Sequence, residues 1–306
     1  MYQSLRGTIY ALIAGICWGF SGTVGQFLFS HTAIDSGWLT TVRLLVSGLI
    51  LLVMAAIQRP QSVTGVWKNR RDALQLVFFG IAGLMAVQYC YMEAIFYSDS
   101  GTATAVQYTG EAMLLVYTCI AARRLPRRSE FFGLVLALFG IFLLATHGSF
   151  SGLVLSPAGL FWGLTAAVAL MIYTASPCRL IEKYGSISIT AQGMLIGGLA
   201  LGLLLRIWQI PGTYTPQALL GTAAITLIGT VLGFTIYLKS TVLIGPLKAG
   251  LIAAVETVSA PFFSRVWLKT PFQPMDYLGF LCILSMVFLI SLPELRKERA
   301  QAPQNS

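Results

Sequence analysis

The chain has 306 residues and a formal net charge of +9, and its composition is 56% hydrophobic and only 10% charged. Soluble domains carry about 25% charged residues, so this composition excludes an ordinary soluble protein. The mean hydropathy of +0.77 instead indicates a chain built largely from membrane-spanning segments.

Ten apolar blocks divide the chain, and each has about the length that crosses a ~30 Å hydrocarbon core as a helix. In chain order they cover residues 8–28, 38–57, 73–95, 101–121, 131–147, 157–175, 188–207, 218–238, 247–267 and 275–292. They lack the alternation of apolar and polar residues that a membrane β-strand needs, so we expect an all-α polytopic membrane protein. Arg6 precedes the first block, but no small-residue cleavage site follows it, and we expect this helix to be retained.

The distribution of Lys and Arg predicts the topology. If the N-terminus lies in the cytoplasm, most of the 20 basic residues fall in cytoplasmic segments. They are Arg6, Arg59, Lys68, Arg70, Arg71, Arg123, Arg124, Arg127, Arg128, Arg179, Lys183, Lys239, Lys248, Arg296, Lys297 and Arg299. The predicted outer ends hold Arg206, Arg265 and Lys269. We therefore expect a multi-pass protein of the cell (inner) membrane with both termini cytoplasmic, whose basic excess faces anionic lipid rather than nucleic acid.

An internal repeat is also visible. An offset of 146 residues places the spans of the two halves in one register, with a small-residue linker at 146–157 between them. The paired residues include Gly83 and Gly229, Tyr91 and Tyr237, Gly133 and Gly279, and Glu130 and Asp276. We expect one five-helix repeat over 1–148, a second over 149–292 and a polar cytoplasmic tail over 293–306. Five is odd, so the second repeat must be inverted, an arrangement found in secondary transporters.

Several segments together resemble EamA-type members of the drug/metabolite transporter superfamily. They are AGICWGFSGTVGQ (14–26), TTVRLLVSGLILL (40–52), YSDSGTATAVQYTG (97–110), FFGLVLALFGIFLLATHG (131–148), AVETVSAPFFS (254–264) and YLGFLCILSMVFL (277–289). The resemblance implies ten helices in two inverted repeats around a central cavity, and export of amino acids or other small metabolites. In such relatives a proline or small residue often stands at the position of Glu111, and many have an acid near 267–270, where this chain has WLKT.

Ionisable residues inside the predicted spans are the first candidates for a functional site. A charge inside a bilayer costs at least ~2.5–3.5 kcal/mol, so such residues normally face a cavity or a partner. They are Arg43, Glu93, Glu111, Lys248 and Glu256. In continuous helices, Gln107 and Glu111 would share one face, and Lys248 and Glu256 would share another. These faces belong to corresponding helices of the two repeats, so we expect a substrate and proton-coupling site between them.

Structural explanations stay open for each of these residues. Glu256 could be paired with Arg43 or Lys248 instead of carrying a proton or binding an amine. Arg43 and Lys248 could reach toward the lipid headgroups, and Glu93 could lie near the water boundary. Pro261, well inside a predicted span, could be a functional hinge or a purely architectural kink.

Neutral polar and aromatic residues could line the cavity, because an amphipathic solute needs apolar walls with a few convergent hydrogen-bonding groups. The candidates are Trp18, Gln88, Tyr91, Gln107, Tyr108, Trp162, Tyr173, Gln192 and Tyr237. Each could equally serve packing or interfacial anchoring. As a set they disfavour a pore for bare ions.

Enzyme signatures are missing from the sequence. There is no Walker loop and no Cys-x-x-Cys pair, and the two histidines, His31 and His147, lie near predicted helix ends. We therefore expect no enzymatic activity, no cofactor and no metal. We expect secondary active transport of a small amphipathic metabolite, such as an amino acid, by alternating access. The family resemblance implies that the direction is export and that a proton gradient or exchange drives it. The alternatives are an exchanger of phosphorylated or nucleotide-linked sugars and a membrane sensor that binds without transporting.

Overall fold

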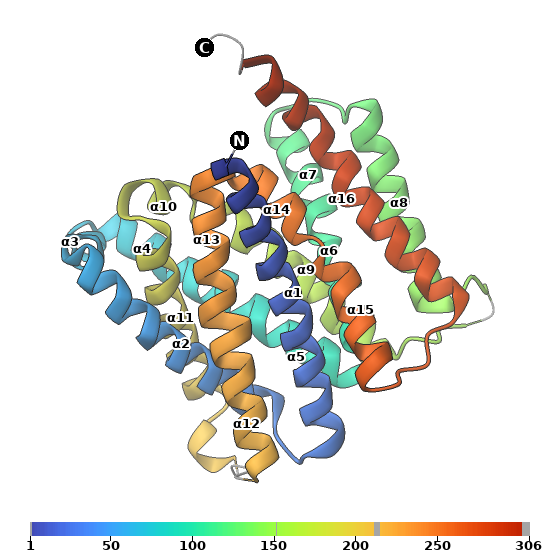
Figure 1. The fold of residues 1–306 in the computed structure, drawn as a ribbon, viewed down its shortest axis with the longest axis horizontal. Helices are drawn as coiled ribbons and strands as arrows, with labels where there is room; N and C mark the ends of the chain where they lie inside the picture. The colour runs from blue at the N-terminus through green and yellow to red at the C-terminus, as the bar shows by residue number, and fades with distance from the viewer. Residues whose placement is uncertain (1, 151, 211–214, 302–306) are drawn as a thin grey trace.

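The computed structural model describes residues 2–150, 152–210 and 215–301, and within these ranges every regular element is a helix (Figure 1). In this part of the chain, nine helical segments are long and apolar enough to cross a membrane. They are α1 (Tyr2–His31), α2 (Ser36–Gln58), a third segment over Arg70–Tyr97, α8 (Arg128–Thr146), α9 (Pro157–Ala175), α11 (Ser186–Leu204), a segment over Pro216–Ile244, one over Pro246–Trp267, and α16 (Pro274–Gln301). Short helices connect them: α3 (Pro60–Gly65), η1 (Val66–Lys68), α10 (Cys178–Tyr184) and η3 (Ile207–Gln209).

The continuous helix expected over 101–121 is wrong, because the structure divides it into α6 (Ser100–Tyr108) and α7 (Gly110–Ala121). At the break, the Thr109 hydroxyl donates a 2.6 Å hydrogen bond to the Val106 carbonyl, and such local bonds compete with the helical pattern. The expected helix over 247–267 is likewise interrupted at Ala254 and Val255, between α14 (Pro246–Ala253) and α15 (Glu256–Trp267). The 146-residue offset maps Thr109 onto Val255, so both repeats break the same helix at the same place.

Two π-helical stretches are also related by the 146-residue offset. The third segment comprises α4 (Arg70–Phe78), η2 (Phe79–Met85) and α5 (Ala86–Tyr97). The segment over Pro216–Ile244 comprises α12 (Pro216–Ala224), η4 (Ile225–Leu232) and α13 (Gly233–Ile244). The offset maps the first residue of η2 onto the first residue of η4. Because π-helical turns are rare and often lie at functional sites, this agreement supports the repeat more strongly than the few sequence identities do.

The α8–α16 pair shows that the repeats are inverted. Gly133 packs against Ile290, and Gly279 packs against Leu144. The 146-residue offset pairs Gly133 with Gly279 and Leu144 with Ile290. The two contacts are therefore equivalent once α8 and α16 are exchanged, as a two-fold axis requires. His147, after the end of α8, also contacts Asp276, at the start of α16, with 2.9 Å between Nε2 and Oδ1. The helices are therefore antiparallel, and the first turn of α1 and the last turn of α16 lie toward the same end of the molecule (Figure 1).

Corresponding acids also start the last helix of each repeat. Glu130 accepts a 2.7 Å hydrogen bond from the Arg127 amide, and Asp276 accepts one of 2.8 Å from the Gln273 amide. An acid in the first turn satisfies an amide that has no partner within the helix and interacts favourably with the helix dipole. This shared role explains why the repeat alignment pairs an acid with an acid.

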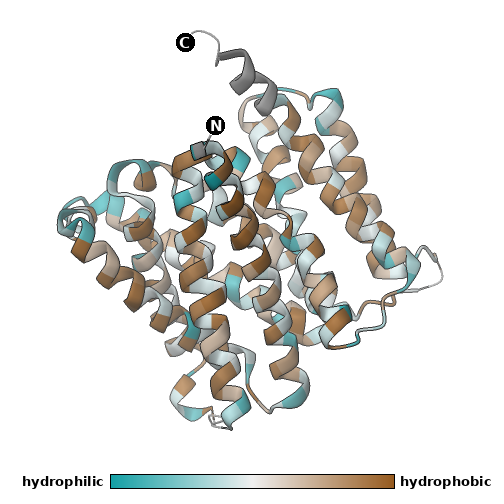
Figure 2. Ribbon diagram, in the orientation of Figure 1, coloured by the Kyte–Doolittle hydropathy of each residue, from teal (hydrophilic) through white to brown (hydrophobic). Residues whose placement is uncertain are grey.

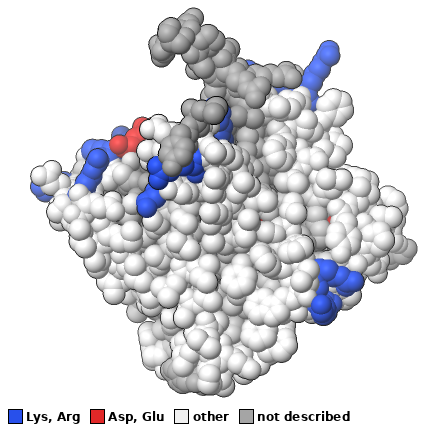
Figure 3. Space-filling model, viewed as in Figure 1, with Lys and Arg blue, Asp and Glu red and all other residues white. Residues whose placement is uncertain are grey.

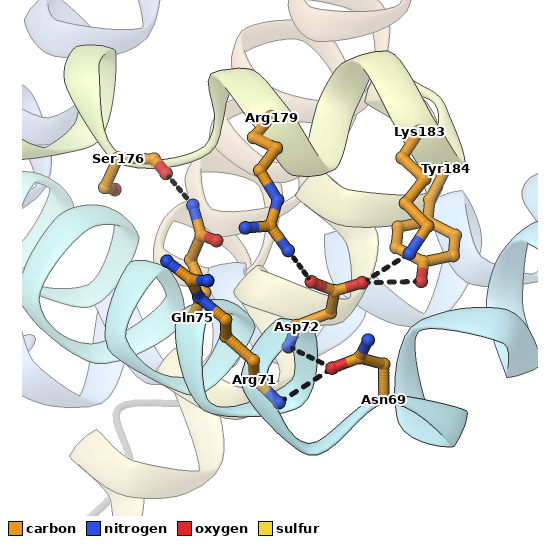
Figure 4. A network of polar contacts seen from close by, with 8 residues as sticks. All are labelled: Asn69, Arg71, Asp72, Gln75, Ser176, Arg179, Lys183 and Tyr184. Atoms are coloured by element: carbon orange, nitrogen blue, oxygen red, sulfur yellow. Dashed lines mark hydrogen bonds and ion pairs between the residues drawn. The ribbon is translucent and has the colours of Figure 1, made fainter.

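Asp72, in the first turn of α4, links the first repeat to α10 of the second (Figure 4). Its fully buried carboxylate accepts hydrogen bonds from Arg179, Lys183 at 2.7 Å and Tyr184 at 2.8 Å. The two cations remain about half exposed. The hydrogen bond to Asp72 raises the pKa of the Lys183 ammonium above its ordinary value.

The outer surface matches a membrane environment. Apolar residues follow the lengths of the helices, and hydrophilic residues gather toward the helix ends (Figure 2). Most Lys and Arg side chains visible in Figure 3 lie at the end of the molecule where α1 begins. Another group lies near the end of α15, where the chain carries Arg265 and Lys269. Large apolar side chains such as Ile57 and Leu138 are more than two-thirds exposed, as lipid-facing residues would be.

Candidate functional site

The centre of the site is a contact between the two interrupted helices. Tyr108, the last residue of α6, donates a 2.9 Å hydrogen bond from its hydroxyl to Oε2 of Glu256, the first residue of α15. Glu256 is 7% exposed. Glu111 occupies the first turn of α7 in the other repeat. Because the start of a helix carries partial positive charge, each interruption offers a favourable place for an acid deep in the protein.

Arg43 approaches this group from α2. Its side chain is 4% exposed, and its Nε donates a 2.7 Å hydrogen bond to the hydroxyl of Thr230 in η4. Its charge interacts with Glu256 and with Tyr91, whose hydroxyl lies 2.8 Å from that of Thr104. Among the described residues Arg43 forms no ion pair with Glu256. The arginine therefore faces the acid without neutralising it directly.

Tyrosines contact the two acids, and further aromatic residues pack beside one of these tyrosines. Glu111 interacts electrostatically with the phenols of Tyr108 and Tyr237. The Tyr237 ring lies 5.2 Å from the ring of Trp18, measured between centroids, and the phenol of Tyr237 also interacts with that of Tyr173. The resulting group combines flat apolar surfaces with a small number of charged and hydroxyl groups, which suits a small amphipathic solute.

Three other candidates from the sequence contact residues outside this group. Glu93 accepts a hydrogen bond from Ser36 at the start of α2, and Gln192 accepts one of 2.7 Å from Trp67. The Trp162 ring packs on Tyr89. Gln88 and Gln107 are buried in α5 and α6, whereas Lys248 is exposed near the start of α14. Roles for these residues in the site stay predictions.

Pro261 lies inside a helical span, as the sequence predicted. It lies within α15, and the interruption of the helix falls at Ala254 and Val255, before Glu256. Gly101, near the start of α6, packs against the proline so closely that a Cβ there would come within 2.8 Å of the Pro261 Cβ. Pro261 therefore takes part in the close packing of α6 on α15, and its role as a hinge stays a prediction.

Gln26 connects three elements at that same end of the molecule, and sequence reasoning missed it. Its Oε1 accepts hydrogen bonds from the Ser100 amide at 3.0 Å and the Ser264 hydroxyl at 2.7 Å. Its Nε2 donates to the Thr270 hydroxyl at 3.0 Å. Gln26 lies inside AGICWGFSGTVGQ, but nothing in the segment separates a glutamine that joins helices from one that faces lipid. The network, here called the Gln26 latch, fixes α1, the start of α6 and the end of α15 together.

The opposite end of the site lacks the corresponding packing. α6 packs against α15 and α1, whereas α7 and α14 share no comparable interface. Likewise α1 packs against α6, but α9, the counterpart of α1 in the second repeat, does not pack comparably against α14, the counterpart of α6. In an inverted repeat the two ends would be equivalent if the molecule were symmetric. The described helices are therefore joined at the α6–α15 end and separated at the α7–α14 end.

These features define a class before they define a family: a polytopic helical membrane protein with two inverted repeats, whose interrupted helices meet at buried ionisable residues. Residues 5–146 and 157–292 match the EamA-like transporter family, and the chain belongs to this family, within the drug/metabolite transporter superfamily. The resemblance found in the sequence is thereby confirmed. The chain is a multi-pass membrane transporter, and the family points away from an enzyme.

Individual relatives agree with this assignment. The chain is 35% identical over 303 residues to the uncharacterized inner membrane transporter YicL of Salmonella typhimurium, with 98% of this chain and 100% of that protein covered. It is 22% identical over 279 residues to the uncharacterized transporter YcbK of Bacillus subtilis, with 87% and 86% covered. A solved structure titled "Crystal structure of protein" has a TM-score of 0.64 at 16% identity and covers 95% of this chain and 98% of its own, which shows likeness of fold.

Proposed function

We propose that the protein is a secondary active transporter that exports a small amphipathic metabolite, such as an amino acid, by alternating access with proton coupling at Glu256. The observation that carries the proposal is the Tyr108–Glu256 hydrogen bond, which joins the interrupted helices of the two repeats. A buried carboxylate in a membrane protein is unfavourable unless a proton or a cation neutralises it. Proton binding and solute binding at one carboxylate can therefore be linked.

The asymmetry between the two ends supports a transport cycle. Lys and Arg gather toward the end where α7 and α14 are separated, so the positive-inside rule assigns that end and both termini to the cytoplasm. The name of the Salmonella relative supports the inner membrane as the location. On this assignment the structure represents a state open toward the cytoplasm and closed outside by the Gln26 latch. Exchanging the packing of the two repeats would generate the outward-open state.

The two alternatives are less well supported. A phosphorylated sugar calls for more than one cation in the site. Arg43 is buried and its charge interacts with Glu256, whereas Lys248 is exposed. A sensor that binds without transporting would have no need for two ends with opposite packing, although it could contain the same acids. Flux measurements separate transport from binding alone.

The test uses purified full-length protein in liposomes. A panel of amino acids and related metabolites is assayed for flux with and without an imposed pH gradient. We expect at least one solute to move faster than in empty vesicles, and the gradient to drive its accumulation. A Glu256→Gln variant should keep solute exchange but lose gradient-driven accumulation, whereas Glu182→Gln, on the exposed face of α10, should behave as the unmodified protein. Full pH-driven accumulation by Glu256→Gln would remove the coupling role, and no flux for any solute would contradict transport of this class of metabolite.

A further inference from the structure

Three buried hydrogen-bond donors beside the site lack partners. Within the described part of the chain, Trp18 Nε1, Ser21 Oγ and Arg43 Nη1 are inaccessible to solvent and make no hydrogen bond. An unsatisfied buried polar group costs ~1–3 kcal/mol, and a charged one costs more. Three such donors in one region therefore require an explanation.

The three donors face one short stretch of the second repeat. Ser21 lies directly against Gly229, and a Cβ on Gly233 would come within 2.8 Å of Trp18 Nε1. Arg43 is bonded to Thr230, between these glycines. The glycines let α1 approach the end of η4 and the start of α13 closely, so the indole, the hydroxyl and the guanidinium gather about a single turn.

The orientation of Arg43 is fixed by Thr230. The Thr230 hydroxyl accepts from Arg43 Nε and donates to the Ile225 carbonyl at 3.2 Å, so its single proton is used and its oxygen is held toward the arginine. With Nε occupied, Nη1 presents its N–H groups to a further acceptor. A guanidinium held in this way suits a planar anion that brings two oxygens.

We propose that Arg43, Trp18 and Ser21 form a subsite for the carboxylate of the transported solute. One carboxylate would neutralise the guanidinium and accept hydrogen bonds from these donors. Glu256, whose charge interacts with Arg43, and Glu111 give the remainder of the site the opposite sign. A zwitterion placed between them would direct its carboxylate to Arg43 and its ammonium to the acids. The nearby acids disfavour a doubly charged phosphate, which would meet one guanidinium and two carboxylates. This proposal rests on the proposed transport function and specifies its ligand.

The test compares matched ligands that differ in the carboxylate. Purified full-length protein is titrated with L-leucine, L-phenylalanine and L-threonine, with the amide of each, and with the amine that remains after decarboxylation. Binding is followed by intrinsic fluorescence and by thermal stabilisation. We expect at least one amino acid to bind about tenfold or more tightly than its amide, as loss of a charge-assisted hydrogen bond implies.

Variants connect this preference to the subsite. Trp18→Phe removes the N–H and keeps an aromatic ring, and Arg43→Lys keeps the charge and removes the planar fork. Both should reduce the preference for the acid over its amide to less than about threefold, while binding of the amine stays unchanged. Arg70→Gln, at an exposed position at the start of α4, is the matched control and should keep the preference.

The outcomes separate the two proposals. If no amino acid is preferred over its amide, or if the preference survives in both subsite variants, the carboxylate subsite is wrong. Flux that does not depend on the carboxylate would leave the transport function standing and overturn the subsite. A third outcome is that Trp18→Phe abolishes carboxylate-dependent binding but the unmodified protein shows no flux in liposomes. This outcome would support the subsite and contradict transport.

Discussion

Tyr108 and Glu256 are 148 positions apart in the chain, yet the hydroxyl of the first donates a 2.9 Å hydrogen bond to the carboxylate of the second. Each residue borders the interruption in the corresponding helix of its own repeat. They are not repeat equivalents, because the offset pairs Glu256 with Gly110 and Tyr108 with Ala254. The hydrogen bond is therefore an asymmetric link between corresponding helices of the two repeats. When one repeat moves relative to the other, the two residues must either move together and keep this hydrogen bond or separate and break it.

Replacing Tyr108 with Phe should weaken transport without unfolding the protein. The ring remains, and the hydrogen bond to Glu256 is lost. Hydrogen bonds to charged groups contribute about 1.5–3 kcal/mol, and 1.4 kcal/mol corresponds to a factor of ten, so flux should fall about tenfold or more. The measurement is initial-rate flux in liposomes at equal protein density. Tyr117→Phe, on an exposed face of α7, is the control. Unchanged flux in Tyr108→Phe would show that the bond has no part in the cycle.

Replacing Glu111 with Gln should change the choice of solute more than the maximal rate. Glu111 interacts with the phenols of Tyr108 and Tyr237, and no ion pair of this acid occurs among the described residues. Loss of its charge should raise the KM for amine-bearing solutes about tenfold and leave solutes without an amine nearly unaffected. Flux over a range of concentrations for matched pairs with and without the amine provides the measurement. An equal loss for both members of each pair would assign Glu111 a structural role.

Most of the fold could be predicted from hydropathy and repeat register, because a membrane restricts a chain to helices of limited length. The span expected over 157–175 coincides with α9, whose start is marked by Pro157 and by the Ser156 hydroxyl that caps Gly159 N. The breaks at Thr109 and at Ala254 could not be predicted in this way. An apolar segment of a given length has the same hydropathy whether its helix is continuous or interrupted.

The site could be predicted in part, for a related physical reason. Glu256, Tyr108 and Arg43 stand out because polar residues are rare inside apolar spans. Their partners do not stand out: Thr230 resembles any threonine in a membrane helix, and Gln26 resembles any polar residue near a helix end. The unsatisfied donors of Trp18, Ser21 and Arg43 become visible only when the packing shows which neighbours fail to accept from them.

Replacing Asp72 with Asn should destabilise the protein in a pH-dependent way. The carboxylate binds Lys183, whose pKa is raised by that bond, so the folded state holds this proton more tightly than the unfolded state does. The resulting stability is fully present below the ordinary lysine pKa of about 10.4 and is lost as the pH rises through the raised value. The melting temperature of Asp72→Asn should therefore lie below that of the parent protein by the same amount at pH 7 and pH 9. The difference should shrink above pH ~10.4.

The comparison is best made with Tyr184→Phe in both proteins, because the Tyr184 phenol also donates a hydrogen bond to Asp72. A Lys183→Gln variant should remove the change in this melting-temperature difference at high pH. The proteins with Asp72 and with Asn at this position should still differ in melting temperature, since Arg179 also forms an ion pair with Asp72. A difference that is constant to pH 11, or one that is absent at pH 7, would contradict a stabilising role for the ion pair with Lys183.

Breaking the Gln26 latch should open the α6–α15 end of the site. Gln26→Ala removes three hydrogen bonds that hold α1, the Ser100 end of α6 and the Ser264 turn of α15 together. These bonds stabilise the state in which this end is closed more than the state in which it is open. Their loss should therefore increase the population of the outward-open state.

Thr23 lies one turn deeper on α1 and is fully buried, so a cysteine at this position reports the opening. In a variant whose natural cysteines are replaced, a membrane-impermeant maleimide added from outside should label Thr23→Cys several-fold faster when Gln26→Ala is also present. Gln209→Ala, at an exposed position in η3, should leave the labelling rate unchanged. Equal labelling with and without Gln26 would mean that packing such as that of Gly101 on Pro261, rather than the latch, keeps this end closed.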